Sequence, residues 1–187
     1  LEPTQIAGFN QFFDDINGTA STRWGLGADW AVTRTLSVGA EATWRTFDEP
    51  TTVISETGST TTDTESGDEE LHRLYAYWTP FERWAFSTGL SYDKYKIDRF
   101  EGDPLPEEVE TITAPLNVTY FHPGGLFAGG GVSYVHQKVD RLPEFSNQGS
   151  STFAVVDLGA GYRLANRRGI ASLSVRNLFD TAFQYQD

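Results

Sequence analysis

The sequence contains no cysteine and no methionine among its 187 residues. The absence of cysteine excludes a disulfide scaffold, a thiolate metal site and a cysteine nucleophile. The chain also lacks an apolar run near the roughly eighteen residues of a membrane-spanning helix, so no such helix is expected. Because it has no methionine and no signal peptide opens it, we expect a processed chain or part of a longer one.

Basic residues are scarce: 14 Lys and Arg stand against 26 Asp and Glu, giving a formal net charge of -12. A phosphate backbone attracts a basic surface and repels an acidic one, which argues against a nucleic-acid partner. The chain is nevertheless 14% aromatic and contains 18 glycines. A solvated acidic tail would contain fewer aromatic residues and glycines, so we expect an ordered structure.

Apolar residues alternate with glycine and polar residues over long stretches, first at 22–32 and again at 36–45. Strict alternation is typical of a strand with two unlike faces. It is weakest in 70–79, where Tyr75 and Tyr77 compete with Leu74 and Trp78 for the apolar face. No segment has the capped, 3.6-residue period of a helix. The expected strands are 22–32, 36–45, 70–79, 83–97, 110–121, 126–138, 152–163 and 169–180.

The connections between these eight stretches alternate in length. Four are short, around 33–35, 80–82, 122–125 and 165–168, and three are long, at 48–69, 101–109 and 139–151. Tight turns at one rim and long loops at the other are the layout of an outer-membrane barrel. The sequence therefore predicts an all-β fold, an antiparallel up-and-down transmembrane β-barrel.

The strands of a soluble β-sandwich also alternate between apolar and polar residues, so a sandwich is the main competing fold. The expected strands reach about twelve residues, against about five or six in soluble sheets. Bulky residues also bracket the apolar face at intervals of eight, which spans roughly 20 Å on a tilted strand. These residues are expected to form lipid-facing girdles: Trp24, Trp30, Trp44, Trp78, Trp84, Tyr92, Tyr120, Tyr134 and Tyr162.

The opposite, polar face carries many glycines, which would leave voids inside a closed eight-stranded barrel and favour a wider one. Four short turns among eight strands also place both chain ends at the long-loop rim, so 1–187 is expected to be a segment with strands missing on both sides. Charges on this face could set selectivity or contact a plug, or form cross-strand ion pairs. The lumen-facing candidates are Arg23, Asp29, Glu41, Arg45, Arg73, Asp93, Asp157, Arg163 and Arg176.

The stretch 174–180, which contains Asn177, Leu178, Phe179 and Asp180, resembles the segment on the penultimate strand of TonB-dependent outer-membrane receptors. The preceding 156–163 is similar to the strand before it. The stretches 3–15, 77–80 and 121–123 resemble a narrower group linked to periplasmic tetratricopeptide repeats. The resemblance implies a barrel of about twenty-two strands with a plug. It also implies energy-coupled uptake of scarce ligands through a plug and a TonB-contacting segment, neither of which is in this sequence.

Residues suited to catalysis or metal binding are few. Clustered acids in 48–70 and 101–110 could attract cations or bridge lipopolysaccharide phosphates through divalent ions, or could simply solvate long loops. His136 with Asp140 is a conceivable acid–base pair, but His72 and His122 lie elsewhere and no metal-binding spacing occurs. We therefore expect no enzyme, cofactor or metal site.

The expected function is the wall of a receptor or transporter in a bacterial outer membrane, in contact with lipid, lipopolysaccharide and an unidentified small ligand. Two alternatives remain open at this point. One is a diffusion porin or anchoring barrel without energy coupling, and the other is a soluble β-rich adhesion or binding domain.

Overall fold

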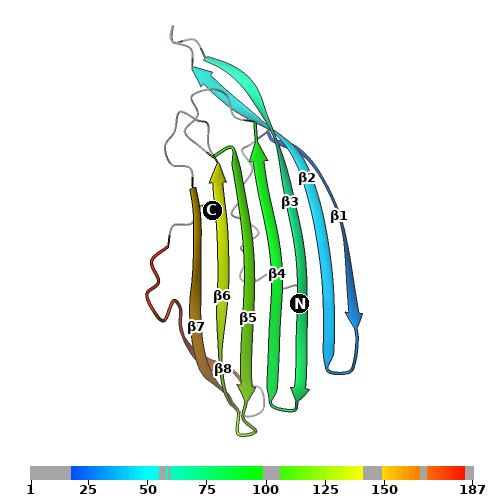
Figure 1. Ribbon diagram of the computed structural model, residues 1–187, viewed down its shortest axis with the longest axis vertical. Coiled ribbons are helices and arrows are strands. Elements are labelled where there is room, and N and C mark those ends of the chain that lie inside the picture. Colours follow the sequence, from blue (N-terminus) through cyan, green and yellow to red (C-terminus); the bar gives the residue numbers. More distant parts are fainter. Residues whose placement is uncertain are drawn as a thin grey trace.

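The computed structural model describes residues 18–54, 58, 60–98, 106–140, 149–164 and 168–183. Within them the chain forms one antiparallel sheet of eight strands in sequence order, and no helix. Each strand pairs with the next along the chain, so the sheet is an up-and-down meander with β1 and β8 at its edges (Figure 1). The all-β, up-and-down prediction is confirmed. The strands are β1 Ala20–Ala31, β2 Leu36–Ile54, β3 Thr60–Phe81, β4 Trp84–Ile97, β5 Glu108–Phe121, β6 Leu126–Asp140, β7 Gly149–Arg163 and β8 Ile170–Val175.

The sheet has two chemically different faces because successive side chains of a strand point to opposite sides. From β1 to β7 the even-numbered positions share one face, which we call the aromatic face, and the odd-numbered positions share the polar face. The parity reverses in β8, where Ala171 lies opposite Tyr162 and Leu173 opposite Ala160. The described residues include no helix of sufficient length and hydrophobicity to cross a membrane.

The acidic segment expected as a loop at 48–69 is mostly strand. β2 continues to Ile54 and β3 begins at Thr60, with Thr51 opposite Asp63 and Thr52 opposite Thr62. This two-stranded ribbon extends beyond the ends of the other strands (Figure 1). Threonine-rich sequence favours strands through its branched Cβ, and this preference outweighs the acidic residues that suggested a loop. We call this end of the sheet the long-loop rim and the other the short-turn rim.

The last strand is shorter than expected. β8 ends at Val175, and the chain then bends away at Arg176. The prediction of a strand over 169–180 was therefore wrong beyond Val175. Arg176, which was expected on the polar face, and Phe179 of the 174–180 motif lie outside any strand, because the backbone leaves the ladder near Asn177, where φ is +49°.

Local hydrogen bonds close the turns at 33–35 and 122–125, as the sequence indicated. Thr33 Oγ1 accepts bonds from the amides of Thr35 and Leu36 at 3.1 and 3.0 Å. In the turn between β5 and β6, Gly125 donates to the His122 carbonyl at 3.0 Å with φ at +96°. Glycine suits that position because a positive φ costs it little. These turns set the registers that align the two faces.

The buried hydrophobic, polar and charged side chains of the described strands lie on the polar face, toward the long-loop rim. Phe47 is 3% exposed and Ile97 is 0% exposed. The aromatic face shows the reverse pattern, with Trp24 60% and Trp30 68% exposed. The sheet therefore presents its bulkiest apolar side chains to the surroundings rather than to its own core. The buried side chains are Arg45, Phe47, Glu65, Ile97, Thr111, Val135 and Gln137.

Candidate functional site

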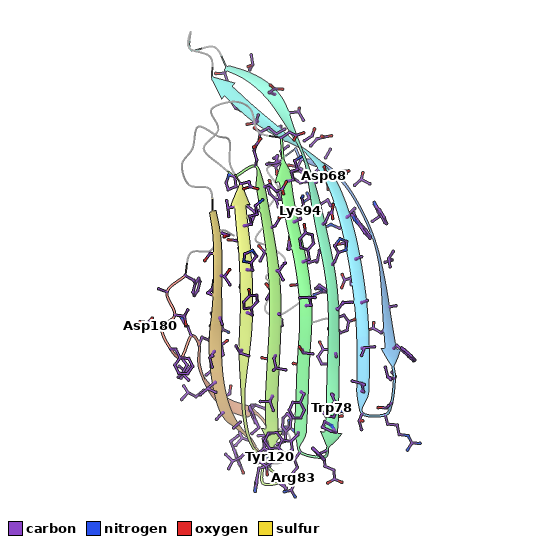
Figure 2. All side chains as sticks on the ribbon, viewed as in Figure 1. Asp68, Trp78, Arg83, Lys94, Tyr120 and Asp180 are labelled. Carbon is purple, nitrogen blue, oxygen red and sulfur yellow. The ribbon has the colours of Figure 1, made fainter. Side chains whose placement is uncertain are left out.

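A row of aromatic rings crosses the aromatic face near the short-turn rim. The rings of Trp78 and Phe86 have centroids 5.4 Å apart, and those of Trp84 and Tyr120 are 5.0 Å apart. Figure 2 shows Trp78 and Tyr120 at this end of the sheet. Farther along the sheet, Tyr162 lies opposite Leu126 and continues the row on β7.

A second row crosses the same face toward the long-loop rim. The Trp24 and Trp44 rings stack at 4.3 Å, and the Trp44 ring meets His72 edge-on at 5.1 Å. His72 stacks on Tyr92 at 6.1 Å. Cross-strand aromatic pairs of this kind stabilise neighbouring strands, here by direct ring contact over four strands. Each row thus crosses neighbouring strands at one level between the two rims of the sheet.

The band between the rows is apolar and uncovered. Leu74 is 56% exposed and Leu116 is 53% exposed, and aliphatic or small residues fill the neighbouring positions. A shallow apolar groove of about 560 Å³ runs across β1 to β4, between Trp30 and Leu90. All five tryptophans of the sequence lie on this face, as do the four tyrosines expected in the girdles. Their contact with lipid stays a prediction.

The charges on the polar face are connected across strands. Glu69 on β3 accepts hydrogen bonds from Arg23 at 3.1 Å and from Arg45 at 2.9 Å, so two guanidinium groups share one carboxylate. Arg73 pairs with Glu41 on the neighbouring strand. Such partners compensate the cost of a charge that is partly removed from water. The structure therefore places four of the candidates in two separate groups, Arg23 and Arg45 on Glu69 and Arg73 on Glu41, and the sequence reasoning missed Glu69.

The other charged candidates are spread over the polar face. The Tyr75 hydroxyl donates to Asp29 at 2.6 Å, and Asp93 lies on β4 opposite Thr111. Asp157 accepts a bond from the Asn177 amide at 2.9 Å. Arg163 lies at the short-turn end of β7, several strands away from the ion-paired arginines on β1 to β3. The nine candidates thus do not form one site.

Glycines on the polar face lie beneath large side chains from neighbouring strands. A Cβ on Gly39 would overlap the Tyr75 ring, one on Gly67 the Phe47 ring, and one on Gly161 the Phe127 ring. Missing side chains at these positions make room for rings that lie against the backbone, as in aromatic rescue of glycine. The expected voids, and the argument for a wider barrel that depends on them, therefore do not hold at Gly39 and Gly161.

The motif at 177–180 forms a turn held by its own asparagine. Asn177 Oδ1 accepts from the Thr181 amide at 2.9 Å, while Asn177 Nδ2 donates to the Thr181 carbonyl at 3.1 Å. The Leu178 amide still donates to the Val156 carbonyl at 2.8 Å, which ties the turn to β7. Asparagine tolerates the positive φ found at residue 177. The turn positions the Phe183 ring on Phe153, with centroids 4.3 Å apart.

The structure does not pair His136 with Asp140, whereas His72 Nε2 lies 3.4 Å from a Glu70 carboxylate oxygen. His136 Nδ1 bonds Thr152 Oγ1 at 2.6 Å, whereas Asp140 pairs with Lys138 at 2.5 Å. His122 lies in the β5–β6 turn and His72 in the aromatic row. Among the described residues, no group of three or more histidine, aspartate or glutamate side chains is arranged to hold a metal ion.

A charged strip lies just beyond the long-loop aromatic row, still on the aromatic face. Register places Glu70, Lys94, Glu110 and Lys138 side by side on β3 to β6. Lys94 contacts Glu108 at 3.1 Å and Glu110 at 3.6 Å. We include in the strip Lys96, which lies two residues farther along β4 on the same face, so that it contains all three lysines of the sequence. Sequence reasoning missed this strip. The even numbers of 94, 96 and 138 could have shown that all three lysines lie on the aromatic face.

Some of the residues singled out from the sequence, including 3–15, Glu56, Glu101 and Asp103, lie outside the described residues. Comparisons of the chain with protein-family models, with curated proteins and with solved structures found no match.

Proposed function

We propose that this chain is part of the wall of a bacterial outer-membrane β-barrel that takes up a ligand, with the aromatic face against lipid. The observation that carries the proposal is the uncovered apolar band bounded by two aromatic rows. Trp84 and Tyr92 mark the rows on β4 and are eight residues apart. At about 3.3 Å per residue and a tilt of about 40°, they are separated by roughly 20 Å, close to the apolar height of a membrane barrel.

The polar face supports the same orientation. Arginines and carboxylates such as Arg45 and Glu69 need water, protein or each other as neighbours, and hydrocarbon supplies none of these. A lumen that holds water or another part of the protein would meet this need. The sequence resemblance at 177–180 favours the receptor form of this function, with a plug and TonB as partners outside this sequence, over a diffusion porin.

One pair of matched variants tests the orientation. Leu90 is 48% exposed on the aromatic face of β4, and Ser91 follows it on the polar face at the same depth. We expect Leu90→Arg to abolish assembly in the outer membrane, because a charge at mid-depth costs about 2–4 kcal/mol. Ser91→Arg should assemble. Assembly of each variant is measured by its heat-modifiable migration on gels and by membrane fractionation. If the two variants assemble equally well, the proposal is overturned.

A second measurement separates lipid contact from a soluble domain. Brominated acyl chains should quench the tryptophans of the vesicle-inserted protein. Trp fluorescence that ignores the bromines, from a protein that stays monodisperse without detergent, would favour the adhesion or binding alternative. Single-channel conductance in planar bilayers distinguishes the porin, which stays open, from a plugged receptor.

A further inference from the structure

Lys96 stands out in the charged strip because its ammonium makes no ion pair or hydrogen bond within the described part of the chain, whereas Lys94 and Lys138 both pair with acids. In register it lies opposite Asp68 on one side and Glu108 on the other. Glu108 is already bound to Lys94 at 3.1 Å. Among the described residues, one exposed cation just beyond the aromatic row thus has no partner.

Lys96 also lines a polar hollow of about 300 Å³. The hollow lies where the β2–β3 ribbon leaves the sheet, and its other walls include Thr46, Asp48, Ser66 and Asp68. Figure 2 shows Asp68 and Lys94 together at this rim, opposite the end that holds Trp78 and Arg83. The hollow combines one cation with hydroxyl and carboxylate oxygens that accept hydrogen bonds from sugar hydroxyls.

The position of the hollow limits what can occupy it. It faces the same side as the apolar band, on the far side of the Trp24–Trp44 stack, where the head groups of a lipid monolayer would lie if the band is in lipid. A lipid there would place its acyl chains on the apolar band and its head group at Lys96. Lysine binds phosphate as a point charge, and the neutral and acidic walls suit hydroxyls rather than a second phosphate.

We propose that Lys96 and this hollow bind the phosphorylated sugar head group of an outer-leaflet glycolipid, with Lys96 on a phosphate and the Thr46, Ser66 and Asp68 side chains toward sugar hydroxyls. Lys94 and Lys138 are already paired with acids, so Lys96 is the one cation that the lining offers to a phosphate, beside Asp48, Asp68 and Asp98. This inference rests on the proposed function, because it requires the aromatic face to lie in the membrane.

The test measures lipid retained by the full-length protein after extraction from vesicles into detergent, by native mass spectrometry. The vesicles contain phosphatidylcholine with lipid A, with dephosphorylated lipid A or with phosphatidylglycerol. We expect lipid A to be retained over the other two. Lys96→Gln should weaken its retention about fivefold, the effect of removing one basic residue near an anionic lipid surface. Lys96→Arg should restore retention.

Arg83→Gln is the matched control, since it removes one exposed cation at the opposite rim. Unchanged retention in Lys96→Gln, or equal loss in Arg83→Gln, would overturn the site. Equal retention of dephosphorylated lipid A would exclude the phosphate contact, and equal retention of phosphatidylglycerol would exclude the sugar. A wild type that does not insert into phosphatidylcholine vesicles would contradict the proposed function, whereas insertion without lipid A retention contradicts this site alone.

Discussion

The polar face of the sheet has two unlike halves. Toward the long-loop rim it carries the buried side chains Phe47, Ile97 and Val135, together with the Arg45–Glu69 ion pair. Toward the short-turn rim the strands instead bring Gly129, Gly131, Gly159 and Ser87 to the same face. The difference shows that the described strands bury side chains almost completely only toward the long-loop rim, which we call the packed half. In the other half, which we call the open half, even the Phe127 ring is only partly buried.

The same structural pair occurs in both halves and allows a direct comparison. Phe47 covers Gly67 in the packed half, and Phe127 covers Gly161 in the open half. Phe47 also stacks on Tyr95 at 5.6 Å and has the Arg45 guanidinium 4.9 Å from its ring centre. Phe127 touches Phe121 at 6.3 Å and is only partly buried.

The largest expected effect is therefore in Phe47→Ala. Removing a ring that is 3% exposed should lower the free energy of unfolding by about 3–5 kcal/mol. Phe127→Ala should cost about 1–2 kcal/mol, because less area is removed from contact. Urea unfolding of the vesicle-inserted protein, followed by tryptophan fluorescence, measures both. Similar losses for the two variants would remove the distinction between the halves.

A smaller effect is expected from adding a methyl group to the covered glycines. A Cβ on Gly67 would lie 2.7 Å from the Lys96 carbonyl and would overlap the Phe47 ring, so the ladder itself must shift. We expect Gly67→Ala to cost about 1–3 kcal/mol. A Cβ on Gly131 meets mainly the movable end of the Asn117 side chain.

Gly131→Ala should therefore cost less than about 1 kcal/mol, since surface changes usually stay small. The same unfolding measurement applies. A larger loss at Gly131 than at Gly67 would show that the open half is packed as tightly as the other.

The alternation of residue types was enough to predict the number, order and faces of the strands. In β1 and β2 a two-residue period runs without a break from Trp24 to Trp30 and from Leu36 to Trp44. Side-chain direction in a strand depends only on parity, so those assignments needed no tertiary information. The short turns were also predictable, because residues such as Gly125 mark the chain reversal in the sequence.

Other features of the fold depend on contacts between residues of different strands, and a single sequence does not show which residues meet. The ribbon of β2 and β3 exists because Thr51 and Thr52 pair with residues ten or more positions away in the sequence. The ring-over-glycine pairs and the Glu69 ion pairs join neighbouring strands in the same way. The end of β8 was misplaced because alternation continues through Arg176, while the local bonds of Asn177 take the backbone out of the ladder.

An expected effect similar in size to that of Phe127→Ala concerns that turn, whose Phe183 ring covers part of the packed half. Asn177 holds the turn that places Phe183 on Phe153, and Phe153 lies opposite the buried Val135. Asn177→Ala removes two hydrogen bonds to Thr181 and puts alanine at a positive φ, for a loss of about 1–2 kcal/mol. Asn177→Gly keeps the backbone conformation and should lose about 1 kcal/mol or less.

Hydrogen exchange at the Leu178 amide reports on the turn itself, because this amide donates to Val156. Faster exchange in both variants with unchanged global stability would mean that the Phe183 cover contributes nothing to the packed half, which would then rest on the strands alone.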